Sequence, residues 1–198
     1  MSSDPIVVVA AKRTPIGSFQ GSLSAATAVE LGTTAARGAL EACDLDPAAV
    51  EEVYFGCVLP AGLGQAPARY AALGAGIPDS TGCVTVNKMC GSGMKTVQIG
   101  HDLLRAGSAK IILAGGLESM SNAPYLLPKA RAGYRMGHQQ VVDHMFFDGL
   151  QNVADGNMMG LFGEQTSQKY GFTREAQDSF AIESVNRALR AIESGVFS

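Results

Sequence analysis

The sequence predicts an α/β fold built on a mostly parallel β-sheet, and three of its features support this prediction. Short runs of apolar, often β-branched residues alternate with stretches in which apolar or small residues recur at helical spacing. The apolar runs are nearly continuous, as they are in strands that helices cover on both faces of a parallel sheet. Strands and helices that alternate at this pitch imply right-handed crossover connections.

The elements of this sheet are expected in the first part of the chain. Strands are predicted at residues 6–10, 53–58, 82–87 and 110–116, and helices at residues 27–43, 66–74 and 91–105. The helix at 91–105 has apolar residues around its whole circumference. Because a helix that is apolar on all sides is normally buried, we expect this one to lie between two sheets.

The composition changes after Glu118. Residues 119–172 are rich in Met, Gly, Asn and Gln and show little strand pattern, which predicts an excursion from the sheet. A helix follows, with Thr173 as its N-cap, apolar residues on one face and a glycine at its end. We therefore expect a sheet domain over residues 1–118 and an incomplete loop domain over residues 119–198.

The charges argue against several classes of partner. The net charge is −3 and the basic residues are scattered, so the sequence predicts no nucleic-acid-binding surface. The densest basic stretch contains Lys129, Arg131 and Arg135, and we expect it to form a solvated loop. No apolar run approaches the roughly 20 residues of a membrane-spanning helix, so no membrane partner is expected.

The four cysteines differ in their surroundings. They show no paired metal-binding spacing, so no metal site is predicted, and reduced thiols in the cytoplasm are expected. Cys43, Cys57 and Cys83 lie within a predicted helix or predicted strands, which favours a role in core packing.

Cys90 lies where a predicted strand has ended and a helix begins, and three glycine or serine residues follow it directly. The positive end of the helix dipole favours a thiolate at this place. Backbone N–H groups of the first helical turn lack intrahelical partners and can stabilise an oxyanion. On position alone, an inert buried cysteine is also possible, because free cysteine is among the most buried residue types.

The segment around Cys90, NKMCGSGMK, closely resembles the nucleophile motif of the thiolases, which reads Asn, two variable residues, then Cys-Gly-Ser-Gly. Further segments resemble the same family in the same order: AAKRTPIGSFQGSL at 10–23, GCVLPAGLGQAPAR at 56–69, AGGLESMSNAP at 114–124, MFFDGL at 145–150 and MMGLFGEQTSQKYGFTREAQDSFAIES at 158–184. The resemblance therefore extends over the whole chain.

This resemblance implies an α-β-α-β-α layered fold in the complete enzyme and an acyl transfer through a thioester. The implied reaction condenses two acetyl-CoA molecules to acetoacetyl-CoA, or cleaves a 3-ketoacyl-CoA with CoA, within fatty acid metabolism. Cys90 matches the acylated nucleophile, and Leu150 and Met159 match residues that line the pantetheine pocket. Core packing is the alternative role of Leu150 and Met159. CoA thioesters are substrates, so no cofactor is implied.

The resemblance also implies a homo-oligomer, either a dimer or a tetramer, and residues 124–145 match the family's tetramer-forming loop. Two departures are visible. Met158 stands where many biosynthetic members have a histidine, which puts a strictly short-chain role in doubt. His101, His138 and His144 lack the glycine-rich setting of the family's base. We therefore expect that the C-terminal thiolase domain, which supplies the base, is absent from this chain.

Two other functions are open at this point. A thiolase-fold fragment without its base could be non-catalytic and bind only CoA or a partner chain. A sister family of condensing enzymes is the other alternative, but the Gly-Ser-Gly that follows Cys90 argues against it.

Overall fold

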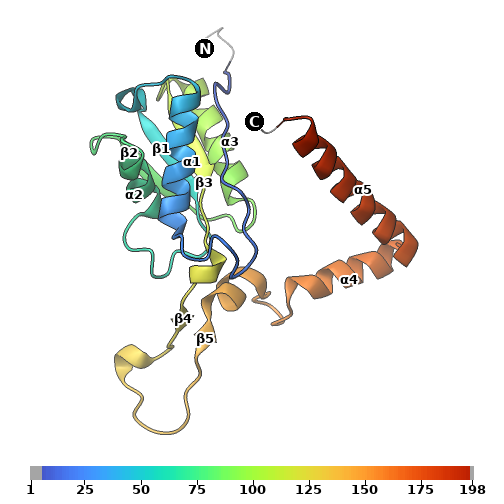
Figure 1. Cartoon of the computed structure of the whole chain (residues 1–198). Coiled ribbons are helices and arrows are strands. Elements are labelled where there is room, and N and C mark those ends of the chain that lie inside the picture. Colours follow the sequence, from blue (N-terminus) through green and yellow to red (C-terminus); the bar gives the residue numbers. More distant parts are fainter. Residues whose placement is uncertain (1–5, 197–198) are drawn as a thin grey trace. The chain divides into compact units, whose positions relative to one another are not determined.

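The computed structural model describes residues 6–196, and the chain divides into two compact units, Met1–Gly149 and Leu150–Ser198 (Figure 1). The boundary between these units lies about thirty residues after the change in composition at Glu118. The assignment of residues 1–118 and 119–198 to separate domains therefore stays a prediction.

The first unit contains a three-stranded parallel sheet. β1 (Glu52–Gly56) lies at the centre, between β2 (Gly82–Val86) and β3 (Ile112–Gly116). Glu52 lies opposite Gly82 on one side and Ile112 on the other, so the three strands begin and end level with one another. Three of the four predicted strands and the α/β class are thereby confirmed.

The predicted strand at residues 6–10 is wrong. This segment has no strand structure, and Val8 is 80% exposed. Both edges of β1 are already paired, and residues 6–10 line an apolar cavity of about 310 Å³ together with β3 residues. A β-branched run forms a strand only where another strand accepts its hydrogen bonds, and here none does among the residues that the structure describes.

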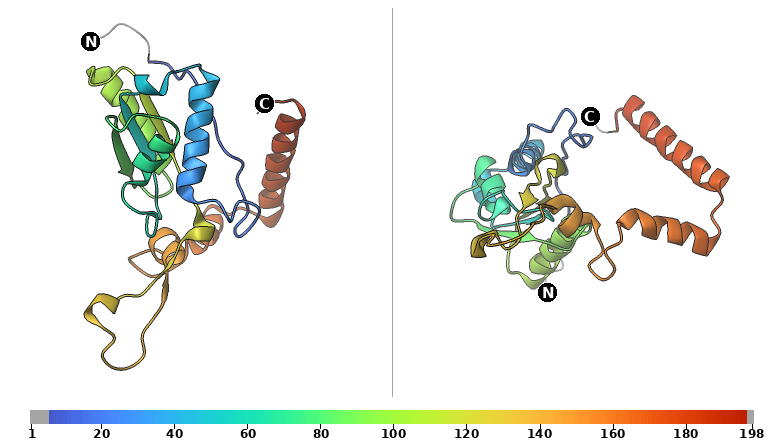
Figure 2. Two further views of the ribbon diagram at one scale, coloured as in Figure 1. Left: turned by 60° about the vertical axis from the view of Figure 1, so that its left-hand side comes forward. Right: turned by 90° about the horizontal axis from the view of Figure 1, so that it is seen from below.

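Helices cover the two faces of the sheet (Figure 2). α2 (Pro67–Gly74) packs on β1 and β2, and α1 (Ala28–Ala42) packs on α2. α3 (Ser92–Ala106) packs on β1 and β3 and lies on the opposite side from α1. All three helices lie where the sequence predicts them.

α1 begins with a capping box. The Glu30 N–H donates to Thr27 Oγ1 at 3.2 Å, and the Thr27 N–H donates to Glu30 Oε2 at 2.8 Å. Its buried residues recur every fourth position and form one face: Ala28, Gly32, Ala36 and Leu40. This face joins the core of the unit, which is centred on Val53 and Phe55 of β1.

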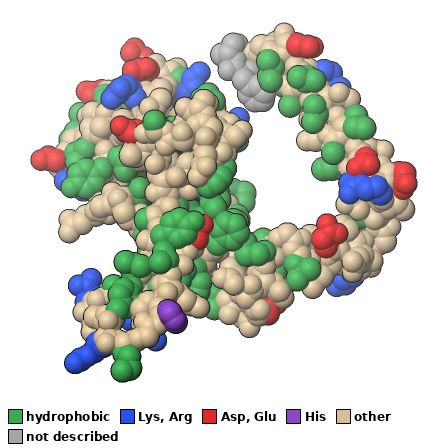
Figure 3. Space-filling model, turned by 60° about the horizontal axis from the view of Figure 1, so that its bottom comes forward, with side chains coloured by type: hydrophobic (Ala, Val, Ile, Leu, Met, Phe, Trp, Pro, Cys, Tyr) green, Lys and Arg blue, Asp and Glu red, His purple; other side chains and the backbone are tan. Residues whose placement is uncertain are grey.

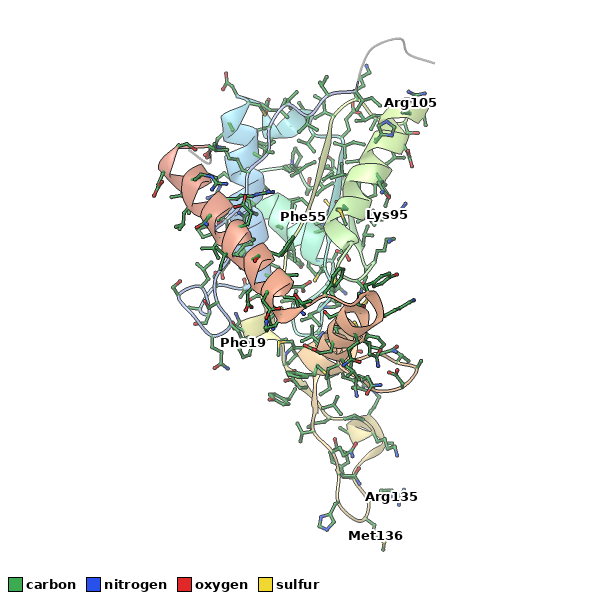
Figure 4. All side chains as sticks on the ribbon, turned by 90° about the vertical axis from the view of Figure 1, so that its right-hand side faces the viewer. Phe19, Phe55, Lys95, Arg105, Arg135 and Met136 are labelled. Atoms are coloured by element: carbon green, nitrogen blue, oxygen red, sulfur yellow. The ribbon has the colours of Figure 1, made fainter. Side chains whose placement is uncertain are left out.

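The prediction that the helix at 91–105 is buried on all sides is wrong for this structure. α3 buries only Ser92, Thr96 and Gly100, whereas Met94 is 70% exposed and Val97 is 52% exposed. The physical reason is that a single sheet contacts α3, and only its small-residue face meets that sheet. Figure 4 shows α3 with Lys95 and Arg105 labelled along it.

The segment after the sheet is mainly loop with short elements, as expected. β4 (Tyr125–Leu126) and β5 (Val142–Asp143) form an antiparallel pair that encloses a long loop. The same segment contains the short helical turns η2 (Met120–Asn122), η3 (Ala130–Ala132) and the π-helical η4 (Met145–Leu150), whereas η1 (Pro47–Ala49) lies before β1.

The second unit contains α4 (Met159–Tyr170) and α5 (Arg174–Glu193). Thr173 caps α5 as predicted, because its side chain accepts from the Ala176 N–H at 3.2 Å. The apolar face of α5 is solvent-exposed in this structure, with Val185 58% and Ile192 67% exposed.

Candidate active site

Cys90 lies between the end of β2 at Val86 and the start of α3 at Ser92, with Gly91 as the N-cap. The structure thus places it at the strand-to-helix junction that the sequence predicts. Its side chain is exposed, unlike the side chain of an inert core cysteine.

The turn that presents Cys90 is held by side chains on both sides. Met89 adopts a left-handed conformation with φ 49°, which costs an L-residue roughly 1–2 kcal/mol. The Asn87 Oδ1 accepts from the Met89 N–H at 2.9 Å. Ser92 Oγ accepts from the Lys88 N–H at 2.8 Å and donates to the Met89 carbonyl at 2.6 Å. These bonds offset the strain at Met89.

The backbone N–H groups near Cys90 are only partly engaged. The N–H groups of Gly91 and Ser92 donate to the carbonyls of Lys88 and Met89, at 3.1 and 2.9 Å. The expectation of free first-turn donors is therefore wrong for Ser92, because its N–H closes the turn onto Met89.

Other donors stay open. Within residues 6–196, the N–H groups of Cys90, Gly93 and Met94 make no hydrogen bond to the protein, and no side chain caps α3. Free N–H groups at a helix N-terminus stabilise a thiolate or an oxyanion close to them.

Glycines allow the start of α3 to approach the carboxyl ends of the strands. A Cβ on Gly56 would lie 2.6 Å from the Cβ of Ser92, and one on Gly116 would lie 3.6 Å from the Cα of Gly93. Thr96 Oγ1 donates to the Gly115 carbonyl at 2.9 Å from within α3. The sheet therefore fixes the position of the helix end that follows Cys90.

Glu118 is a residue of this region that composition and spacing did not single out. Its carboxylate accepts from the N–H groups of Val58 and Leu59 at 2.8 and 3.0 Å, and Cys57 Sγ donates to it at 3.6 Å. The sequence signal that could have found Glu118 is its place just after the strand that ends at Gly116, because the loops that follow parallel strands meet at one edge of a sheet.

The other three cysteines contrast with Cys90. Burial, together with the neighbouring Glu118 carboxylate, raises the pKa of Cys57 to about 12. Burial also raises the pKa of Cys83. Cys43 is the C-cap of α1 and is partly buried. Cys57 belongs to the core and Cys83 packs against it, so the predicted packing role is confirmed for these two, whereas Cys43 lines the cavity beside residues 6–10.

The described histidines do not bond to Cys90. His101 is exposed and contacts Asp102, while His138 lies exposed in the loop between β4 and β5. His144 is buried: its Nδ1 bonds to Asp148 at 2.6 Å, and its Nε2 accepts from the Ala61 N–H at 3.4 Å. These contacts give His144 a structural role between η4 and the loop that follows β1.

Leu150 and Met159 belong to the second unit. An antiparallel bridge joins Gln151 to Met158, so Leu150 and Met159 lie directly outside this bridged pair. Leu150 is half-buried and Met159 is 46% exposed as the first residue of α4. The structure thus brings these two predicted pocket residues to one place within their unit.

The basic residues Lys129, Arg131 and Arg135 are exposed in the loop between β4 and β5. Figure 3 shows Lys, Arg and His side chains gathered there beside hydrophobic ones, and Figure 4 places Arg135 and Met136 at the end of this loop. These basic side chains are exposed to solvent in the single chain, as the sequence predicts.

Two further features bear on function. In the part of the chain that the structure describes, no group of three or more His, Cys, Asp or Glu side chains gathers where it could hold a metal ion. None of the helices between residues 6 and 196 is both long and apolar enough to cross a membrane.

Comparison with known proteins gives a consistent result. The family model "Thiolase, N-terminal domain" matches residues 6–198. Acetyl-CoA acetyltransferase 1 of Arabidopsis thaliana is 51% identical over 193 residues, which cover 98% of this chain and 46% of that protein. The acetyl-CoA acetyltransferases of Pseudomonas aeruginosa and Escherichia coli K12 are 50% and 49% identical, each over 97% of this chain and 49% of the relative. The chain spans about half the length of these relatives.

Proposed function

The chain belongs to the thiolase family, and from this premise we propose that it accepts the acyl group of an acyl-CoA thioester on Cys90. The observation that supports this role most is the place of Cys90, which is exposed directly before the N-cap of α3 and beside N–H groups that make no hydrogen bond to the described residues. The names of its relatives, acetyl-CoA acetyltransferases, support an acetyl group as a substrate.

The first step is a thioester exchange. The Cys90 thiolate attacks the carbonyl carbon of acyl-CoA, and the carbonyl oxygen becomes an oxyanion. The open N–H groups at the start of α3 are the donors that can stabilise this negative charge. When the oxyanion collapses, the bond to the CoA sulfur breaks, CoA leaves as a thiolate that takes up a proton, and the acyl group stays on Cys90.

The second step needs a base. The deprotonated methyl carbon of acetyl-CoA attacks the Cys90 thioester, the bond from the acyl carbon to Sγ breaks, and acetoacetyl-CoA and the Cys90 thiolate are released. The reverse reaction cleaves a 3-ketoacyl-CoA with CoA. The residues that the structure describes place no histidine in a hydrogen bond with Cys90. We assign the base to the C-terminal half that the relatives possess beyond the matched region.

Leu150 and Met159 are proposed to contact the pantetheine arm. Both are large apolar residues, and their common place beside the Gln151–Met158 bridge supports a shared surface. Apolar side chains of this kind suit the uncharged, flexible part of CoA.

The chain is proposed to form a homo-oligomer, either a dimer or a tetramer, through the loop between β4 and β5. This loop has no acidic residue between Glu118 and Asp143, whereas the whole chain has a net charge of −3. It also exposes Leu127 and Met136, and Tyr125 of the preceding β4 is exposed as well. Basic and apolar groups together fit an acidic surface on a second copy.

The four free cysteines support a reducing, cytoplasmic compartment, and the acyl-CoA substrates support a place in fatty acid metabolism.

An exchange assay tests the acyl-accepting role without the second step. The protein is mixed with acetyl-CoA and isotope-labelled CoA, and the label in acetyl-CoA is followed. We expect label to enter acetyl-CoA, because acyl-Cys90 returns its acetyl group to labelled CoA. If acetyl-CoA stays unlabelled while labelled CoA binds, the chain is the non-catalytic CoA-binding protein that forms the alternative.

A further inference from the structure

The carboxylate of Glu118 holds the loop that follows β1. It accepts three hydrogen bonds from consecutive residues: from the N–H groups of Val58 and Leu59, and from the thiol of Cys57. Some sixty residues of chain separate Glu118 from these donors. The carboxylate therefore joins the end of β3 to the end of β1.

Glu118 has no cationic partner. Between residues 6 and 196 no lysine or arginine lies within ion-pair distance of it, although its side chain is partly buried. Removing a carboxylate from water is unfavourable unless hydrogen bonds compensate, and here only two N–H groups and one thiol do so. These hydrogen bonds fix the position of the Glu118 carboxylate between the ends of β1 and β3.

A second set of bonds links this loop to the turn that presents Cys90. The Val58 N–H donates to Glu118, and the Val58 carbonyl accepts from Asn87 Nδ2 at 3.4 Å. The other end of the Asn87 amide accepts from the Met89 N–H at 2.9 Å. Val58 and Asn87 therefore connect Glu118 to the residue that directly precedes Cys90.

The Cys90 turn depends on such support. Met89 has the left-handed backbone conformation, which an L-residue keeps only where its surroundings enforce it. The side chains of Asn87 and Ser92 bond to the backbone of residues 88 and 89, in addition to the backbone N–H groups of Gly91 and Ser92. A shift of Asn87 would change the direction in which Cys90 points.

We propose that Glu118 is a positioning residue for Cys90: through Val58 and Asn87, it fixes the turn that holds the sulfur in line with the acyl carbonyl. This inference rests on the proposed role of Cys90 as the acyl acceptor. Glu118 itself touches neither the substrate nor the reacting atoms.

The test compares acylation rates of wild type, Glu118→Gln, Asn87→Ala and the double variant, with acetyl-CoA as the probe and Cys90 acylation followed by mass spectrometry. Glu51→Gln is the matched control. The Glu51 carboxylate also accepts a backbone N–H, from Lys110 at 2.6 Å, but at the amino end of the same sheet. Amide hydrogen exchange of residues 88–92 is measured in every variant.

Both single variants should lose about tenfold or more in acylation rate, because a small misplacement of a reacting group has effects of this size. The double variant should be no slower than the slower single variant, since both changes break one connection. Amide exchange at 88–92 should become faster in both variants and stay unchanged in Glu51→Gln. Asn87 is exposed, so its variant tests the connection even if Glu118→Gln does not fold.

Equal acylation rates for Glu118→Gln and Glu51→Gln, or losses that add fully in the double variant, would overturn the proposal. A wild type that takes up no acyl group would instead refute the role of Cys90. In that case, unchanged exchange at residues 88–92 in Glu118→Gln and Asn87→Ala would refute the link from Glu118 to the turn as well.

Discussion

Cys90 and Cys57 show how the surroundings of a residue decide its chemistry. Cys57 is buried, and the neighbouring Glu118 carboxylate keeps its thiol protonated. Cys90 is exposed and has no hydrogen bond to the Glu118 carboxylate, which accepts instead from the N–H groups of Val58 and Leu59 and from Cys57. Only the thiol at the start of α3 is both accessible and close to open backbone donors in the described part of the chain.

Replacing Cys90 with serine should abolish the labelled-CoA exchange, with a loss of roughly three orders of magnitude or more. The reason is that an alcohol is a far weaker nucleophile than a thiolate near neutral pH. The matched variant Cys83→Ser alters a partly buried thiol and should retain the exchange. Exchange that survives in Cys90→Ser would assign the acyl acceptor to another residue.

Cys57 should make stability fall at alkaline pH. Its pKa is about 12 in the folded protein, above the ordinary value of 9.0. Its stabilising contribution is therefore complete below pH 9.0 and is lost as the pH rises towards about 12, because the unfolded chain ionises first.

The measurement for Cys57 is denaturant unfolding of wild type and Cys57→Ala across this pH window. The difference between their free energies of unfolding should shrink as the pH rises. Curves that stay parallel would contradict the shifted pKa.

At the scale of elements, the contact between α3 and the strand ends determines where the start of α3, and with it Cys90, lies. Gly56→Ala should destabilise the protein by about 1–3 kcal/mol, because the new Cβ would meet Ser92 at 2.6 Å. Acyl transfer should fall as well, since the start of α3 must move.

Gly38→Ala within α1 is the control for this substitution. Its Cβ would meet only the Lys12 side chain, at 3.9 Å. It should stabilise the helix by about 0.5–1 kcal/mol. Thermal or denaturant unfolding measures both variants, and similar stabilities for the two would show that the α3–strand contact is not tight.

Local patterns predicted most of these elements. The alternation of apolar runs and helical spacing placed α1, α2, α3 and three strands, and the Thr173 cap placed the start of α5. The strand at 6–10 failed because a strand needs backbone hydrogen bonds to a neighbouring strand, and this run lies beside the edge strand β3 without making them. No local pattern reveals such pairing.

The site was predictable only in part. Cys90 could be found because strand, cysteine, glycines and helix are contiguous in sequence. The contacts of Glu118 join residues about sixty positions apart, and the bond between His144 and Ala61 joins more distant ones. Such pairings depend on how strands and loops are brought together, so one sequence does not disclose them.

At the scale of the whole molecule, the loop between β4 and β5 tests the proposed assembly. Met136 is 89% exposed at the end of this loop. Met136→Asp should lower the molar mass measured by light scattering, because a carboxylate would face an acidic surface on the second copy. Val153→Asp, at a 97% exposed residue of the second unit, should leave the mass unchanged. An unchanged molar mass in both variants would show that the loop between β4 and β5 takes no part in forming the oligomer.

Another whole-molecule prediction follows from the proposal that this chain supplies the nucleophile and the C-terminal half supplies the base. Residues 1–198 alone should exchange CoA but should not cleave acetoacetyl-CoA, because the carbon–carbon step needs a base. Addition of the C-terminal half of a relative should restore cleavage. Cleavage by residues 1–198 alone, at the rate of the complete enzyme, would show that a residue of this chain, such as His101, serves as the base.

The central claim is that Cys90 receives the acyl group, and the most direct measurement is mass spectrometry after brief mixing with acetyl-CoA. The protein is quenched in acid, its intact mass is recorded, and the modified peptide is sequenced. We predict a gain of one acetyl group, located on Cys90 and removed again by added CoA. An unmodified protein, or an acetyl group on another residue that CoA does not remove, would contradict the account.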